Sequence, residues 1–548
     1  MVPTDDLQVK KLCIGALCLA ALFGFLAFGS GIVIFTLEMH DQVAVSFALG
    51  YASGGEILPL LANILGMFLK PPSCSPVSVA YLVLYSTAVT VLNESMGYIH
   101  SCSLRWALQE EGKLDFHSNL RLFTSSAKSK PNGNLANKTF LAGIVLSYYS
   151  IPLIFVTFDP LLAQVLNSQV APVLDTNRVY INSMALLALG LGLIIQAIIA
   201  FWSLGCEIRS WSANPLDTAR VCAKPKNEKM KHQIQHREGR ALMSVHDQDL
   251  DPESRYPLTR QDMMCRAHKH VRRVVWFAGF MLAGSYIWAF AVYVSIRTGN
   301  KNGVLGNSSA PWRVITGSVY DCGGSQCTNG TSILHIDSTG QGSSLQTEAW
   351  GFLIVLFQVP FSVSLHCAEL VVNLTQDEYV YRQLIDPRGT SPYYDAISSY
   401  FNSWPKGILF ALKVVVHFLF GQSVNLSYEL GVNMYWPPLV WLAAANTVTF
   451  LFILHLATRR PRGALPAAYG HLQTIVDVVD EWPETKCMFW GHKSPDLSDD
   501  ETKAPCYAGT SGGFLDKVRQ DMKYGGGAQD VPTPNSLDAG SQSAADLG

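Results

Sequence analysis

Charged side chains are scarce in this chain of 548 residues. Asp, Glu, Lys and Arg make up 15% of it, whereas soluble proteins carry about 25%. Hydrophobic residues make up 49%, and they gather in runs of roughly 17–25 residues, the length that crosses a hydrocarbon core of about 30 Å. This composition argues against a set of soluble domains. The net charge of −2 creates no field that would attract nucleic acid, so no nucleic-acid partner is predicted.

Motifs of the common enzyme classes are also lacking. The sequence contains no glycine-rich phosphate loop, no zinc-spaced CxxC pair and no nucleophile elbow. We therefore predict no cofactor and no metal, and a non-enzymatic protein is favoured over an enzyme. Twelve cysteines in so long a chain do not form a disulfide scaffold. Those at Cys13, Cys18 and Cys367 lie in apolar runs and are interpreted as small hydrophobic residues.

Nine hydrophobic stretches predict an all-α fold, a polytopic bundle of transmembrane helices. They span residues 12–37, 43–69, 77–97, 140–158, 181–204, 274–296, 349–372, 404–420 and 434–457. The predicted organisation is five helices in residues 1–204, a basic loop at 205–273, four helices in 274–457 and a soluble tail at 458–548. Membrane lipid is the expected surrounding of this bundle.

The distribution of Lys and Arg predicts the orientation of the helices. Residues 205–273 hold fourteen Lys and Arg residues, whereas residues 297–348 hold three. Cytosolic loops of membrane proteins carry an excess of these residues. We therefore predict that the basic loop and the C-terminal tail are cytosolic and that residues 297–348 are extracytosolic. A plasma membrane or a membrane of the secretory pathway is expected.

The extracytosolic side is predicted to carry glycans and one disulfide. Cys322 and Cys327 lie in a loop of small residues, where a short disulfide fits an oxidising compartment. The sequons predicted to be glycosylated are Asn307, Asn329 and Asn425. The sequons expected to stay unmodified, because they fall on the cytosolic side, are Asn137 and Asn373.

The number of crossings has an open alternative. With nine crossings the N-terminus lies outside, where Lys10 and Lys11 break the charge rule. Eight crossings with a cytosolic N-terminus would satisfy it. The stretch at 43–69 would then not cross, because its Gly-Gly pair and its proline could form a re-entrant element buried in protein. We favour nine crossings over eight.

The tail contains one patterned segment, whose apolar residues share a helical face. We expect this face to dock on the cytosolic side of the bundle rather than on lipid headgroups. From Lys493 onward Ser, Asp, Gly and Pro dominate, and disorder is predicted. Residues 464–548 are a candidate contact for a cytosolic protein partner. The apolar face consists of Leu472, Ile475, Val476, Val479 and Trp482.

Short motifs in the tail form a second pattern. They are Arg459–Gly463 (RRPRG), Tyr469–Thr474 (YGHLQT), Trp482, Trp490–Lys493 (WGHK) and Ala508–Ser511 (AGTS). This pattern resembles the C-terminal pattern of uncharacterised fungal multi-pass membrane proteins. The resemblance covers a small part of the chain. It implies a multi-pass fungal membrane protein, and it brings no activity, substrate or catalytic residue.

Carboxylates inside a membrane are costly and point to function by default. Glu56 lies about 13 residues into the second stretch, so about 20 Å deep at roughly 1.5 Å per residue. We interpret it as a proton or cation site; the competing interpretation is a neutral carboxyl that fixes helix packing. Glu94, at the cytosolic edge of the third stretch, is assigned to interfacial pairing with His100 and Arg105.

Four further ionisable residues lie in the seventh and eighth stretches. Glu369 and Lys413 fall in the same leaflet on consecutive helices and are predicted to pair. Lys413 could instead snorkel to the cytosolic interface, and His417, one turn away, is expected to be neutral in a helix contact. His366, Glu369 and His417 could form a metal site, but no second His-x-x-Glu motif supports one.

Three functions are compatible with this sequence. The favoured one is a small-molecule or ion transporter with a midplane carboxylate at Glu56, because bent helices accompany the buried charge. The alternative is a non-enzymatic membrane scaffold or receptor-like protein that acts through its cytosolic tail. The third is a membrane enzyme on a lipid-like substrate, with acid–base candidates Glu94, His366, Glu369 and His417.

Overall fold

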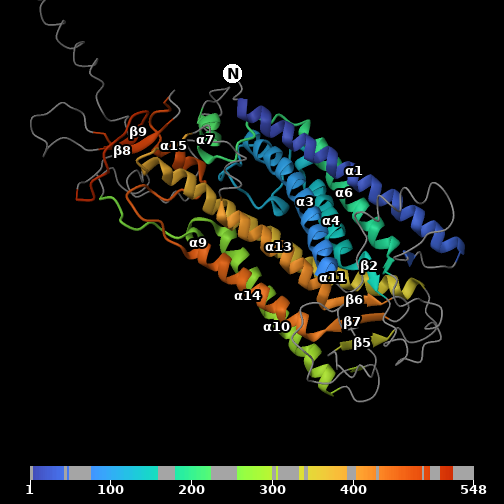
Figure 1. Ribbon diagram of the computed structural model, residues 1–548. Helices are drawn as coiled ribbons and strands as arrows, with labels where there is room; N and C mark the ends of the chain where they lie inside the picture. Colours follow the sequence, from blue (N-terminus) through green and yellow to red (C-terminus); the bar gives the residue numbers. More distant parts are fainter. Residues whose placement is uncertain are drawn as a thin grey trace, which may run out of the picture.

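The computed structural model of the chain is built mainly from α-helices (Figure 1). It describes residues 4–41, 46–47, 76–157, 179–223, 256–298, 304–305, 333–337, 344–391, 403–427, 431–483, 487–493 and 507–521. Within these residues, eight long helices form the bundle. They are α1 (Thr4–Asp41), α3 (Pro76–Glu110), α4 (Asn134–Leu153), α6 (Ser183–Leu204), α10 (Lys269–Thr298), α11 (Ser344–Arg382), α13 (Trp404–Ser423) and α14 (Trp436–Thr458). Each covers one of the predicted stretches, or most of it.

Several of these helices suit a membrane. By length and composition, α1, α6, α10, α13 and α14 can each cross one. On α10 the side chains of Trp276, Phe280 and Phe290 are exposed on the outside of the bundle. Water would not favour such a row of large apolar side chains, whereas lipid tails would surround it without cost. The fold is therefore that of a membrane-embedded helical bundle.

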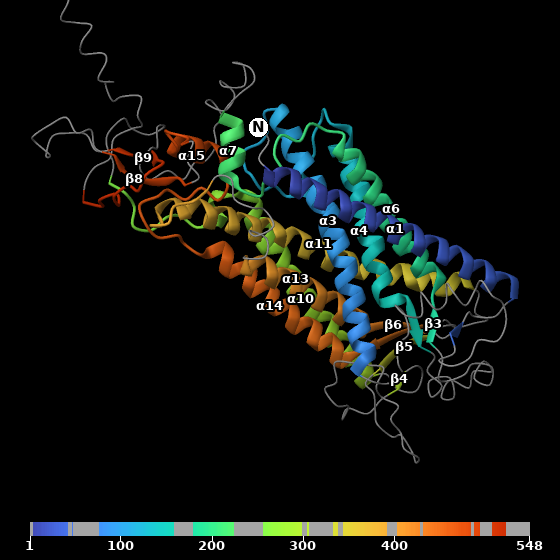
Figure 2. The same ribbon diagram turned by 45° about the horizontal axis from the view of Figure 1, so that its top comes forward.

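The bundle has two ends that are built differently (Figures 1 and 2). The tail end carries α7 (Pro215–Ala223), α9 (Met264–Ala267), α15 (Leu472–Val478), β8 (Phe489–Lys493), β9 (Tyr507–Ser511) and the 3-10 turns η1 (Arg121–Phe123), η2 (Lys130–Asn132) and η3 (Gln383–Ile385). The sheet end carries an antiparallel sheet in the order β4 (Val304–Leu305), β5 (Ile333–Asp337), β7 (Gly431–Tyr435) and β6 (Val424–Ser427). A second sheet there has the order β1 (Ser46–Phe47), β3 (Val179–Ile181) and β2 (Phe155–Thr157).

The direction of α1 bears on the crossing count. Gly24 of α1 faces Leu193 of α6, and Gly31 faces Leu187, so the two helices are antiparallel. The chain therefore enters α1 at the tail end and leaves it at the sheet end (Figure 1). Lys10 and Lys11 thus lie at the same end of the bundle as α7, α9 and the tail elements. In this position they do not conflict with the charge rule.

The start of α3 also lies at the sheet end (Figure 2). Tyr85 of α3 contacts Ser150 near the end of α4, whereas His100 stacks on Phe140 near its beginning. α1 therefore ends, and α3 begins, at the same end of the bundle. The described residues contain eight long helices, so the nine-crossing prediction is not confirmed, and the stretch at 43–69 lies outside the described residues except for β1. Glu56 falls between these helices, outside the described residues.

The predicted modification sites are only partly within the described residues. Asn425 lies in β6, the edge strand of the sheet-end sheet, opposite Asn433 of β7. Asn137 lies at the tail end, where its amide donates to Thr124 O at 2.5 Å and is buried. The remaining predicted sites, namely Asn307, Asn329, Cys322 and Cys327, lie outside the described residues. The cysteines of the described part are free thiols.

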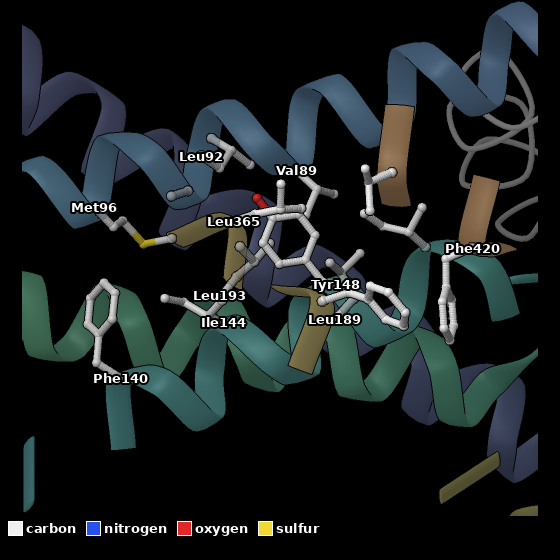
Figure 3. Close-up of a cluster of buried hydrophobic side chains, with 14 of the residues drawn as sticks. Val89, Leu92, Met96, Phe140, Ile144, Tyr148, Leu189, Leu193, Leu365 and Phe420 are labelled. Carbon is white, nitrogen blue, oxygen red and sulfur yellow. The ribbon is translucent and has the colours of Figure 1, made fainter. Parts of the chain in front are cut away.

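The core of the bundle lies where α3, α4 and α6 meet α11 and α13 (Figure 3). A buried aromatic ring lies at each end of this core, Phe140 toward the tail end and Phe420 toward the sheet end. Aliphatic residues pack between them from each helix. The central ones are Val89, Leu92, Met96, Ile144, Leu189, Leu193 and Leu365.

Glycines bring α6 close to both α1 and α4. A Cβ added at Gly190 would lie 2.6 Å from the Cα of Phe28 in α1. One added at Gly192 would lie 2.7 Å from the carbonyl oxygen of Gly143 in α4. Real Cβ contacts are longer, so only glycine allows these backbones to approach. Small residues at helix contacts are a general device of membrane proteins, where apolar burial drives little association.

The tail folds onto the tail end of the bundle. Leu472 and Ile475 of α15 are buried, and Trp482 packs against the same apolar cluster. The cluster includes Trp106 from the end of α3 and Leu216 of α7. The predicted docking of this helical face on the bundle is therefore confirmed.

The expectation of disorder from Lys493 onward is wrong for residues 507–521. There β9 pairs with β8, with Trp490 opposite Thr510. The pairing satisfies the backbone of both strands and buries Ala508 and Thr510. Composition missed this strand because its partner lies before the polar segment rather than inside it.

Replacing Gly190 with Ala should lower the stability of the purified protein. The added methyl group meets the backbone of Phe28, which cannot yield as a side chain could, so we expect a loss of about 1–3 kcal/mol. Gly29→Ala is the matched control, because a Cβ on Gly29 meets nothing within 4 Å. Thermal unfolding in detergent measures both. Equal unfolding temperatures for the two variants would contradict the proposed close contact.

Candidate functional site

The most unusual side chain inside the bundle is Lys413 of α13. Its side chain is 2% exposed, and its Nζ donates to Oε1 of Glu94 in α3 and to Oε1 of Glu369 in α11. Ammonium and carboxylate groups are rarely buried unless they pair. Three helices that are far apart in the sequence thus meet at one charged point, which we call the triad.

Two histidines adjoin the triad on its sheet-end side. His366 lies one turn before Glu369 in α11, and its Nδ1 is 2.6 Å from Glu369 Oε1. His417, one turn after Lys413, stacks on Tyr148 of α4 with ring centroids 3.9 Å apart. Neither ring nitrogen of His417 has a hydrogen-bond partner among the described residues, and neither does His366 Nε2. The polar cluster therefore extends from the triad toward the sheet end.

The predicted pairing of Glu369 with Lys413 is confirmed, but Lys413 does not snorkel. Two carboxylates hold its ammonium inside the bundle, where the side chain is buried. The assignment of Glu94 to interfacial pairing is wrong. Arg105 instead donates to the carbonyl oxygens of His117 and Ser212.

The sequence gives little indication that Glu94 meets Lys413. The two residues are 319 positions apart, and only the packing of α3 against α13 brings them together. One indication was available: Glu94 is a carboxylate that interrupts an apolar run, and such a group needs a cationic partner.

The donor set of the cluster could hold a cation. Ligand atoms of Glu94, His366 and Glu369 lie within 4.8 Å of one another. This set differs from the predicted one, since it contains Glu94 in place of His417. Carboxylate oxygen with imidazole nitrogen suits several divalent metals. However, the ammonium of Lys413 contacts both carboxylates, so a tethered cation already occupies that position.

Hydrogen-bonded amides continue the polar interior beside the triad. Asn93 precedes Glu94 in α3, and its Nδ2 donates to Ser147 Oγ of α4 at 3.0 Å. Gln196 of α6 donates to Asn93 Oδ1 at 2.9 Å. These contacts link α3, α4 and α6 in the buried interior of the bundle, where an unsatisfied amide is expensive. They fix the helix that carries Glu94.

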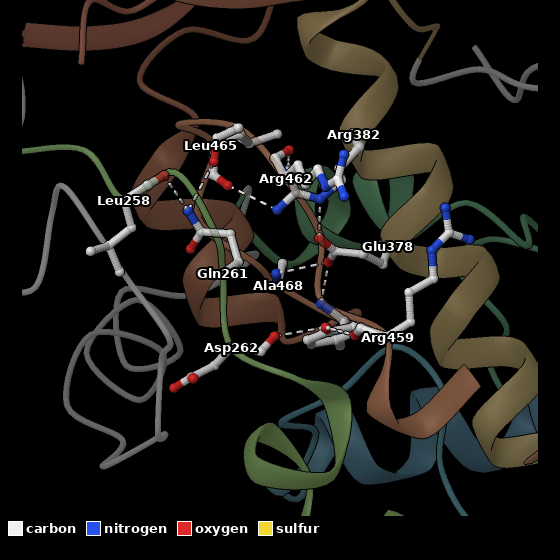
Figure 4. Close-up of polar contacts among 11 residues, drawn as sticks. Leu258, Gln261, Asp262, Glu378, Arg382, Arg459, Arg462, Leu465 and Ala468 are labelled. Carbon is white, nitrogen blue, oxygen red and sulfur yellow. Dashed lines mark hydrogen bonds and ion pairs between the residues drawn. The ribbon is translucent and has the colours of Figure 1, made fainter. Parts of the chain in front are cut away.

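A second charged cluster holds the tail in place (Figure 4). Glu378, at the tail-end extension of α11, accepts hydrogen bonds from the backbone N–H groups of Ala468 and Tyr469 at 2.9 and 2.7 Å. Arg382 donates to Glu378 and also to the carbonyl oxygens of Arg462 and Leu465. The Glu378–Arg382 ion pair on α11 thus forms hydrogen bonds with backbone groups in and next to the RRPRG and YGHLQT motifs.

Asp377 sits beside this ion pair and is buried. Ser118 Oγ donates to its Oδ2 at 2.8 Å, and a Cβ on Gly470 would lie 2.6 Å from the same oxygen. Burial raises the pKa of Asp377 to about 7, against the opposing effects of Ser118 and the Arg105 and Lys406 charges. Burial also lowers the pKa of His117 well below its usual value. The 3.8 Å contact of its Nε2 with Asp377 Oδ1 therefore involves a neutral imidazole.

Comparison with known proteins gives no guide to what these clusters do. The chain matches no protein-family model, no curated protein and no solved structure. Function therefore has to be inferred from the residues themselves. The triad and its histidines are the strongest basis, because charged groups inside a membrane need a reason to be kept there.

Replacing Lys413 with Met should destabilise the protein strongly. The change leaves two carboxylates facing each other without a cation, and breaking such a buried network costs about 3–5 kcal/mol. The triple variant Glu94→Gln, Lys413→Met and Glu369→Gln removes all three charges and should recover most of that loss. Thermal unfolding followed by tryptophan fluorescence measures the difference.

The matched control is Lys113→Met. Lys113 pairs with Glu111, but its side chain is 55% exposed, so its loss should change stability by less than about 1 kcal/mol. If Lys413→Met unfolds at the same temperature as this control, the triad does not hold the helices together.

The contribution of Asp377 to stability should fall as pH rises from about 4 to 7, opposite in sign to that of buried histidines such as His117. The folded protein holds a proton on Asp377 up to about pH 7, whereas the unfolded chain releases it near 4. This contribution is therefore fully present below about pH 4 and is lost as pH rises through 7. The unfolding temperature of Asp377→Asn should rise relative to that of the wild type as pH increases from about 4 to 7, because the amide has no proton to release. A difference between the two proteins that stays constant over this range would contradict the raised pKa of Asp377.

Proposed function

We propose that the protein is a membrane transporter that uses the triad as its proton-coupling site. The observation that supports this most is a fully buried lysine bonded to two carboxylates from different helices. With both carboxylates ionised, the triad by itself carries one negative charge more than Lys413 balances. The two carboxylates are the groups of the triad that would take up a proton in the proposed cycle.

Uptake of a proton at the triad would change how the helices hold together. A protonated carboxyl no longer attracts the Lys413 ammonium as strongly, so the link from α13 to either α3 or α11 weakens. A ligand or proton shifts a conformational equilibrium only by its differential affinity for the two states. A charge shared between three helices supplies such a difference, because each helix arrangement sets how well the charge is paired.

The carboxylates are accessible in a way that the lysine is not. The side chains of Glu94 and Glu369 are 25% and 21% exposed, whereas that of Lys413 is 2% exposed. A proton can therefore reach either acid without displacing the lysine first. His366, bonded to Glu369 on one side and unpartnered at Nε2 among the described residues, continues the route toward the sheet end.

The orientation of this transporter follows from the charge rule. We assign the tail end to the cytosol of a plasma membrane or secretory-pathway membrane, and the sheet end to the other side. Glycosylation at Asn425, Asn307 and Asn329 and a disulfide between Cys322 and Cys327 belong to that second side. The small-molecule substrate could use Glu56 as well.

The alternative of a scaffold acting through its tail has less support. The apolar face that suggested a docking element for a partner is buried against α7 and the end of α3. A cytosolic partner of residues 464–548 would have to use the outer surface of the tail instead.

Reconstituted vesicles test the proposed transport. Uptake of at least one labelled solute, from among amino acids, carboxylates, sugars and nucleosides, should appear and should grow with an inward proton gradient. Glu94→Gln and Glu369→Gln should abolish the effect of the gradient, because neither amide can take up the proton. Lys113→Met serves as the control.

Two results would count against the proposal. Absence of uptake for every solute class would remove transport. Uptake with an unchanged proton dependence in both glutamine variants would remove the triad from the coupling.

A further inference from the structure

Exposed cations gather at the tail end of two helices that pack together, α10 and α14. Gly279 of α10 faces Phe450 of α14, and Tyr286 contacts Thr447, so the two helices are antiparallel. The beginning of α10 therefore lies beside the end of α14, and the segments before and after them meet there. Their exposed Lys and Arg side chains, which we call the basic patch, are Arg260, Lys269, Arg272, Arg273, Arg459, Arg460 and Arg462.

Backbone pairing joins the two segments that carry the patch (Figure 4). The N–H of Gln261 donates to the carbonyl oxygen of Pro461 at 3.0 Å. Arg260 and Arg462 are directly opposite each other in an antiparallel bridge. Like charges in opposite positions destabilise a strand pair, so an anion bound between them would stabilise this pairing.

Acidic side chains of the described residues do not neutralise the patch. Residues 256–273 and 459–463 contain eight Lys and Arg residues but only one acid, Asp262. Asp262 pairs with Arg266 at 3.4 Å. Within the described part of the chain, none of the seven patch cations forms an ion pair. The patch is therefore a concentrated positive surface that suits a partner with several negative charges.

The patch continues into the lipid-facing surface of α10. Five exposed residues share one face of this helix, because steps of three and four positions connect them. Exposed tryptophan is typical of the level where headgroups meet acyl chains. The cations lie about one turn, roughly 5 Å, beyond the tryptophan of this face, which is the level of the headgroups. The five residues are Lys269, Arg272, Arg273, Trp276 and Phe280.

A second exposed tryptophan indicates the same level. Trp404, at the beginning of α13, is 54% exposed, and its ring centroid lies 6.1 Å from that of Phe452 in α14. Arg459 comes seven positions after Phe452, so it lies about 10 Å further along the axis at roughly 1.5 Å per residue. The cations after α14 thus also lie beyond the tryptophan level.

From this arrangement we propose that the basic patch binds the headgroup of a polyphosphorylated inositol lipid in the leaflet at the tail end. The phosphates lie against the arginine side chains, and the acyl chains lie along Trp276 and Phe280. The charge rule assigns this leaflet to the cytosol, the side on which a membrane carries its anionic lipids. The proposal concerns a lipid partner and does not depend on transport.

The chemistry of the patch favours several phosphates on one headgroup. Arginine presents a planar fork of donors that binds phosphate oxygens in pairs, and six of the seven patch cations are arginines. A headgroup with one net charge, such as that of phosphatidylserine, would leave most of the patch uncompensated. The aromatic residues beside the cations favour a lipid over a soluble inositol phosphate, which has no acyl chains to cover them.

Binding of a fluorescent short-chain phosphatidylinositol bisphosphate to the purified full chain in detergent tests the proposal. The anisotropy of the probe should rise as protein is added, above its value in protein-free micelles. Arg272→Gln with Arg273→Gln should weaken binding about 25-fold, because each cation near an anionic surface contributes about fivefold. Arg459→Gln with Arg460→Gln should have a similar effect, because these residues form the other part of the patch.

Two further variants are matched controls. Lys10→Gln with Lys11→Gln removes two exposed cations of α1 at the same end of the bundle. The net charge changes by the same amount, but binding should change less than about twofold, because salt screens distant charges. Arg272→Lys with Arg273→Lys keeps the charge and loses the forks, so it should bind with intermediate affinity. Equal unfolding temperatures of all variants show that these exposed substitutions leave the fold intact.

Five outcomes would overturn the lipid site. Absence of probe binding, or wild-type affinity in both arginine-to-glutamine pairs, would remove the patch as a binding surface. An equal loss of binding in the Lys10 and Lys11 variant would show an effect of net charge alone. Competition by short-chain phosphatidylserine at the same concentration as by the unlabelled bisphosphate lipid would remove the selectivity for several phosphates. Inositol trisphosphate that binds as tightly as the lipid would assign the patch to a soluble polyanion.

Discussion

The buried ion pairs of Lys413 with Glu94 and Glu369 are the constraint on which the helix arrangement depends. An ammonium inside a membrane must be neutralised, and only carboxylates from neighbouring helices can do so without water. α3, α11 and α13 therefore have to converge at one level. The polar contacts of Asn93 with Ser147 and Gln196 then hold α4 and α6 against α3. The apolar core fills the remaining volume but does not by itself select this arrangement.

At the tail end, too, charged side chains of α11 bind groups from a distant part of the chain. Glu378 and Arg382, on the extension of α11, bind backbone groups of the tail rather than its side chains. Gly470, at a φ of +73°, fits against Asp377 where any side chain would collide. The helix that supplies Glu369 to the triad therefore also anchors the tail. A shift of α11 along its axis would change both the contact of Glu369 with Lys413 and the contact of Glu378 with the tail.

Local patterns were sufficient for the helices themselves. Apolar length predicted where eight of the stretches form helices, and the spacing of apolar residues predicted the docked face of α15. They were also sufficient for the Glu369–Lys413 pair, because those residues lie on consecutive helices at matching depth. The direction of α1 was not predictable in this way, since the two lysines before it and the count of stretches gave opposite answers. Packing against α6 decides it.

The sequence by itself determined that this protein is a bundle of membrane helices with ionisable groups inside. It could do so because hydrophobic length and helical period are properties of neighbouring residues. Only the tertiary structure decided which partners the charges meet: Glu94 with Lys413, and Glu378 with the backbone of the tail. These contacts join residues far apart in the chain, and their energy comes from the loss of water around both partners at once. No single segment contains that information.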